Sequence, residues 1–152
     1  MPWDTIHLFL CSVVPSLCQL FAWLNEKLCN DQPCLIPKAV GEAIGREMRA
    51  GRPTVPLSQA RSLRNIYKNS GSYLAVDWMY FLLSVGKVVL VDRIPEEFGK
   101  MFMFLCRAGG LLFKPSSLME DERMAVAKLL KLFCHVFYEY VYGEKVERLR
   151  LC

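Results

Sequence analysis

Residues 98–113 read FGKMFMFLCRAGGLLF, and this stretch decides the fold. Its only charged residues are Lys100 and Arg107, and its apolar side chains occur all around a helical wheel. A helix that is apolar on every side belongs in the interior of a protein. The sequence therefore predicts an all-α fold, with about six to seven helices around a central hydrophobic helical hairpin.

The segments on either side also carry helical periodicity. An amphipathic helix is expected over residues 16–30, and a thinner one over residues 40–48, where Gly41 and Gly45 are weak helix formers. A short apolar stripe follows, opposite a face that is expected to be solvated and carries Arg61, Arg64 and Lys68; the stripe is Leu57, Ala60, Leu63, Ile66 and Tyr67. An apolar helix is expected over residues 73–91, of which the end would also suit a strand, and Pro95 with Glu96 and Glu97 marks the start of the next helix. The last predicted helix starts near residue 120; its inner stripe is Val126, Leu130, Phe133, Phe137 and Val141, and its outer stripe is Lys128, Lys131, His135 and Glu139.

Length and charge narrow the class of protein. The chain has 152 residues, of which 53% are hydrophobic, so it is expected to form a single helical domain over residues 1–152, with an apolar N-terminal extension at 1–15 and a core at 16–142. The formal net charge is only +4. A dedicated nucleic-acid binder carries a much denser cationic surface, so no nucleic-acid partner is expected.

The apolar residues 6–24 raise the question of a membrane segment. No Lys or Arg precedes them, no small-residue cleavage site follows them, and polar residues and Pro15 interrupt them. We therefore expect a buried or interfacial helix, a cytoplasmic protein and no stable membrane anchor; residues 144–152 are too charged to be a tail anchor. A role of residues 6–14 in membrane binding or in a homodimer stays open.

Motifs of catalysis and cofactor binding are missing. The sequence has no Gly-rich phosphate loop, nucleophile elbow, zinc-protease motif or dinucleotide fingerprint, and its only histidines are His7 and His135. We expect no enzyme and no cofactor. Seven cysteines, an odd number, suit reduced thiols.

A zinc site is the one metal centre to weigh. Cys29, Cys34, Cys134 and His135 are ligands of suitable type. However, neighbouring residues of a helix point about 100° apart, which makes convergence of Cys134 and His135 on one ion difficult. No metal site is therefore expected. A helical adaptor or scaffold, with structural zinc as optional support, is the alternative function.

Three separated segments resemble the motifs of one family. Residues 92–100, DRIPEEFGK, lead through the apolar run to Gly109 and Gly110; residues 20–28 read LFAWLNEKL, and residues 44–48 read IGREM. In order and approximate spacing they resemble the homology motifs of the Bcl-2 family of apoptosis regulators. Lys100 stands where the family usually has Arg, and Arg46 replaces an acidic residue. The short chain without an anchor would suit a viral member.

The resemblance implies a function without catalysis. It implies an apoptosis inhibitor that sequesters the amphipathic death-motif helices of pro-apoptotic Bcl-2 family proteins in a hydrophobic groove, in the cytoplasm or at the mitochondrial surface. Gly99 would let the partner backbone approach, Lys100 would pair with the partner's Asp, and Glu97 would be a polar contact at the rim. The pockets would be lined by Met48, Val91, Phe102 and Met103, each of which would otherwise be an ordinary core residue.

Overall fold

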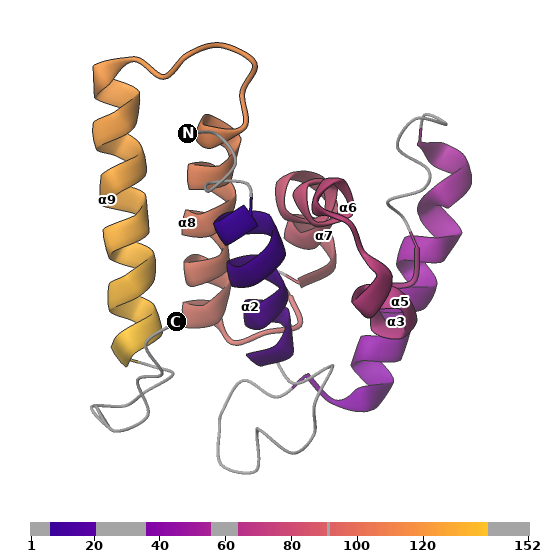
Figure 1. The fold of residues 1–152 in the computed structure, drawn as a ribbon. Coiled ribbons are helices and arrows are strands. Elements are labelled where there is room, and N and C mark those ends of the chain that lie inside the picture. The colour runs from indigo at the N-terminus through magenta and orange to yellow at the C-terminus, as the bar shows by residue number, and fades with distance from the viewer. Residues whose placement is uncertain (1–6, 21–35, 56–63, 91, 140–152) are drawn as a thin grey trace. The chain divides into compact units, whose positions relative to one another are not determined.

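The computed structural model describes residues 7–20, 36–55, 64–90 and 92–139, and the ordered elements of these ranges are all helical (Figure 1). They form six continuous helical segments, so the predicted all-α class is confirmed. In chain order the elements are the π-helical η1 (His7–Val13), α2 (Val14–Leu20), α3 (Lys38–Gly51), the 3-10 turn η3 (Arg52–Thr54), α5 (Ile66–Asn69), the 3-10 turn η5 (Ser70–Ser72), α6 (Ala75–Tyr80), the π-helical η6 (Phe81–Val85), α7 (Gly86–Leu90), α8 (Glu96–Leu112) and α9 (Glu120–Phe137).

The chain divides into two compact units, Met1–Pro95 and Glu96–Cys152. The first unit holds the elements from η1 to α7, and the second consists of α8, α9 and the segment that joins them. Among the helices of the described ranges, none has both the length and the apolar character that crossing a bilayer requires.

The apolar N-terminal residues form one continuous helix, in which η1 runs directly into α2. Phe9 and Leu10 are buried, and η1 packs against α6. Because this burial removes apolar surface from water, the helix starts well before the predicted position at residue 16. Residues 21–30 of the predicted helix lie outside the described part of the chain.

Helix α3 follows Pro37, whose carbonyl accepts hydrogen bonds from the N–H groups of Val40 and Gly41 at 2.8 and 3.0 Å. Its buried face is Gly41, Ile44, Gly45 and Met48. The predicted helix is confirmed, and Gly41 and Gly45 lie on the packed face, where a small residue permits close contact with a neighbouring element.

The apolar residues 75–90 are helical throughout, as α6, η6 and α7, so the strand alternative is wrong for this range. Phe81 and Leu82 are fully buried, and Trp78 meets Phe81 edge-on at a centroid distance of 6.2 Å. The helix ends before a turn at residues 92–94, and α8 begins at Glu96, directly after Pro95, as predicted.

In the second unit, α8 and α9 lie side by side as a hairpin (Figure 1). The predicted inner stripe of α9 is confirmed, because Val126 and Phe133 are buried, and Phe133 stacks on Phe137 at 5.7 Å. The outer stripe is exposed, and Val141 lies outside the described residues.

Glu122 fixes the start of α9. Its carboxylate accepts the N–H of Met119 at 2.8 Å and pairs with Lys114 of the connecting segment. The hydrogen bond from Lys114, followed by the one from Met119, lowers the pKa of Glu122 below its ordinary value. The charged carboxylate therefore supports the first turn at neutral pH.

Candidate functional site

The first turns of α8 hold five of the seven predicted partner-binding residues, Glu97, Gly99, Lys100, Phe102 and Met103. Residues three and four apart lie on one face of a helix, so Gly99, Lys100 and Met103 share a face. Lys100 is 51% exposed, and Met103 is half-buried. A Cβ added at Gly99 would meet no atom within 4 Å, so the backbone is open at this point.

Lys100 is held by two carboxylates of its own helix. Its Nζ lies 2.9 Å from Glu96 Oε1 and 3.1 Å from Glu97 Oε1. The hydrogen bond to Glu96, followed by the one to Glu97, raises the pKa of Lys100, so the side chain is cationic at neutral pH. Both partners of Lys100 belong to the first turn of α8.

Phe102 and Met48 lie in the core. Phe102 is 1% exposed on α8, and Met48 is 2% exposed on α3 of the first unit. Both positions fit the core interpretation that the sequence left open. Val91 lies outside the described residues. The structure thus brings Glu97, Gly99, Lys100 and Met103 together on the first turns of α8.

The candidate zinc ligands are only partly described. Cys134 and His135 are exposed on α9, and His135 Nε2 lies 3.7 Å from Glu139 Oε2. Cys29 and Cys34 lie outside the described residues. Within the described ranges, no three His, Cys, Asp or Glu side chains are grouped to hold a metal ion.

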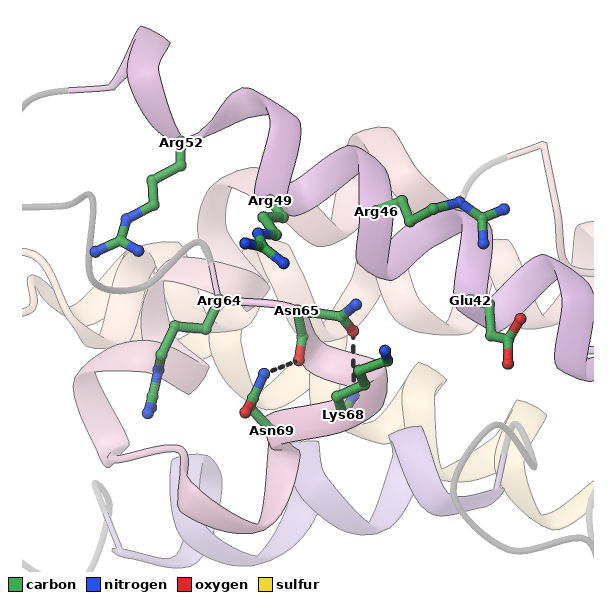
Figure 2. A pocket seen from close by; sticks show the side chains of 8 residues that line it. All are labelled: Glu42, Arg46, Arg49, Arg52, Arg64, Asn65, Lys68 and Asn69. Atoms are coloured by element: carbon green, nitrogen blue, oxygen red, sulfur yellow. Dashed lines mark hydrogen bonds between the residues drawn. The ribbon is translucent and has the colours of Figure 1, made fainter.

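A second candidate site, in the first unit, was missed by the sequence analysis. A cavity of about 520 Å³ is lined by Glu42, Arg46, Arg49, Arg52, Arg64, Asn65, Lys68 and Asn69 (Figure 2). We call it the cationic pocket, since five of its eight residues are cationic and one is acidic. The three-residue spacing of Arg46, Arg49 and Arg52 indicates one cationic face of a helix, which forms the first wall of the pocket. The second wall is formed by residues 64–69, and no sequence pattern places these residues beside α3.

The two walls of the cationic pocket meet at Gly45 and Asn65. A Cβ added at Gly45 would overlap the carboxamide of Asn65, which shows how closely α3 approaches this side chain. Asn65 caps α5, because its Oδ1 accepts the N–H of Lys68 at 3.1 Å. The side chain of Asn69 donates to the Asn65 carbonyl at 3.0 Å. The position of Lys68 and Asn69 therefore depends on Asn65.

Gly45→Ala is expected to lower the free energy of unfolding by about 1–2 kcal/mol. The new methyl group displaces the Asn65 side chain, and overpacking and loss of an N-cap outweigh the better helix propensity of alanine. Gly51→Ala is the matched control, because a Cβ at Gly51 meets no atom within 4 Å. Urea unfolding followed by circular dichroism measures both variants. Equal stability of the two would show that α3 and Asn65 are not in contact.

Arg64 departs from its predicted place on a solvated face. Its Nη2 lies 2.9 Å from Oδ2 of Asp77, a fully buried residue, and donates to the carbonyl of Ser72 at 2.9 Å. Its guanidinium also lies over the ring of Tyr73, 5.2 Å from the centroid. Arg64 therefore lines the cationic pocket with its charge already compensated, and the prediction of a solvated Arg64 is wrong.

Comparison of the chain with family models, with curated proteins and with solved structures found no match.

Proposed function

We propose that this protein inhibits apoptosis by binding the amphipathic death-motif helices of pro-apoptotic Bcl-2 family proteins. The proposal rests on the resemblance of three ordered segments and, above all, on one observation in the structure. An exposed cation, an open glycine and a half-buried methionine share one face of α8 at Lys100, Gly99 and Met103. Helix recognition needs a charge that fixes register, a point of close backbone approach and an adaptable apolar contact.

Lys100 is suited to exchange partners. Its ion pairs with Glu96 and Glu97 are exposed and lie within one helix, and water screens such pairs so that they contribute little to stability. An aspartate on a partner helix can therefore replace the glutamates at little cost. On this proposal the protein acts in the cytoplasm, and its bound partners bring it to the mitochondrial surface.

Calorimetric titration with a panel of synthetic death-motif peptides tests the proposal. Submicromolar binding to one or more peptides supports it. Lack of heat across the whole panel, from a sample whose circular dichroism is helical, contradicts it and leaves the helical adaptor as the function to pursue.

Lys100→Glu is expected to weaken binding of the best peptide by more than about fivefold, which corresponds to about 1 kcal/mol. The variant loses the pairing with the partner's aspartate and adds repulsion. Lys128→Glu makes the same charge change on the exposed stripe of α9 and serves as the control. Calorimetric titration of both variants with the peptide shows whether Lys100 contacts the partner helix. An unchanged peptide affinity of Lys100→Glu would mean that Lys100 is not part of the interface.

Gly99→Ala is expected to stabilise the fold and to weaken binding of the death-motif peptide. Replacing a helical glycine that has open space at its Cβ position with alanine adds up to about 1 kcal/mol of stability. A methyl group at this point would keep the partner backbone away, and we expect at least a tenfold loss of peptide affinity. Gly110→Ala is a matched control on the same helix, because a Cβ there also meets no atom within 4 Å. The midpoint temperature of thermal unfolding should rise in both variants, whereas calorimetric titration should show a loss of peptide affinity only in Gly99→Ala. Equal peptide affinities of the two variants would exclude close approach of the partner backbone at Gly99.

A further inference from the structure

We propose that the cationic pocket binds the phosphoryl groups of a small, multiply phosphorylated molecule. The inference goes beyond the proposed peptide binding and does not depend on it, because the pocket belongs to α3, η3 and residues 64–69 of the first unit.

Four cations of the pocket take no part in the salt bridges of the described residues. Among the described residues, no ion pair is formed by Arg46, Arg49, Arg52 or Lys68. Glu42 lies one turn before Arg46 without pairing with it, and Glu47 pairs with Arg93 at 2.6 Å. Like charges on one helix face repel each other, so a bound anion would remove an unfavourable interaction.

Stabilisation of α3 alone does not account for this cluster. Cations near the C-terminal end of a helix are favourable for its dipole, which would explain Arg49 and Arg52. Lys68, however, comes from the opposite wall. Figure 2 shows Arg49 and Lys68 pointing into the space between α3 and α5. Two elements therefore direct positive charge into one concavity.

The shape and chemistry of the pocket favour a phosphorylated small molecule. Its volume of about 520 Å³ lies within the usual range of small-molecule sites. Guanidinium groups form paired hydrogen bonds with phosphate oxygens, and a lysine adds a point charge. A phosphoryl group concentrates up to two negative charges at one point, which suits a compact pocket better than an extended acidic peptide does. The amides of Asn65 and Asn69 border the same space and can contact hydroxyl groups.

Titration of the full chain with inositol hexakisphosphate in about 150 mM salt is the first arm of the test, because this salt concentration screens weak surface attraction. Flotation with phosphatidylcholine vesicles, with and without phosphatidylinositol bisphosphate, is the second arm. We expect saturable binding of the free inositol phosphate. Additional flotation only with the phosphoinositide would identify a lipid headgroup as the source, and its absence would identify a soluble ligand.

Arg49→Gln/Lys68→Gln is expected to weaken binding at least tenfold. Lys128→Gln/Lys131→Gln removes the same charge from the exposed stripe of α9 and should stay within about twofold of the wild type. If the first double variant loses its helical circular dichroism, each single substitution is measured instead and should weaken binding at least threefold.

Three results would overturn the proposal. These are absence of binding in both arms, an equal loss in the two double variants, and equal affinity for a glutamate-rich peptide or a single-stranded RNA. The last result would reflect general attraction of anions to a cationic surface.

Discussion

Replacing Asp77 with alanine is expected to lower the free energy of unfolding by about 3 kcal/mol. The Asp77 carboxylate is fully buried, and its Oδ2 accepts hydrogen bonds from Arg64 Nη2 at 2.9 Å and from the N–H of Leu74 at 2.8 Å. Truncation leaves both donors without this acceptor, at the N-terminal turn of α6. Removing one partner of a buried pair is strongly destabilising, because the other partner loses its compensation.

Two further variants complete the test at Asp77: one removes the charge but keeps the size of the side chain, and the other is a control at an exposed carboxylate. Asp77→Asn keeps an acceptor oxygen for Leu74 and should lose less stability than Asp77→Ala. Asp92→Ala removes an exposed carboxylate and should change stability by less than about 0.5 kcal/mol. Urea denaturation measures the free energy of unfolding of all three variants. If Asp77→Ala lost no more stability than Asp92→Ala, the carboxylate of Asp77 would not be shielded from water.

The same ion pair shows why part of the structure could not be predicted from the sequence. Periodicity placed Arg64 on the solvated face of a helix, but α5 begins only at Ile66, so Arg64 precedes the helix. Its partner lies thirteen residues further along the chain. Hydrophobic periodicity reports which face of an element is apolar and contains no information about which polar groups meet after folding.

Elements with strong local signals were predicted well. Pro95 and two glutamates mark the start of α8, and the apolar stripe of α9 predicts the side that packs. The cationic pocket depends instead on the approach of Asn65 to Gly45. Gly45 appeared in the sequence only as a weak helix former, because its role depends on a neighbour that is distant along the chain.

For the candidate site on α8, the sequence predicted a set of partner-binding residues and left their orientation open. Lys100 is exposed and the half-buried Gly99 has open space at its Cβ position, as a binding surface requires, whereas Phe102 is buried. Residues 102 and 103 are neighbours on a helix and therefore point in directions about 100° apart. One of them is a core residue, and the other is available to a partner.

Substitutions at these neighbouring positions should therefore have different effects. Phe102→Ala is expected to cost about 3–5 kcal/mol of stability, as truncation of a buried phenylalanine usually does. Met103→Ala removes a half-buried side chain and should cost less than about 1.5 kcal/mol, while lowering peptide affinity at least threefold. Phe102→Leu retains most of the apolar volume and keeps the comparison possible if Phe102→Ala does not fold. Denaturant unfolding and peptide titration of the variants measure the two effects separately. Loss of binding in Phe102→Leu together with unchanged binding in Met103→Ala would mean that the partner contacts the buried apolar face of α8. The face that carries Gly99 and Lys100 would then not be the binding surface.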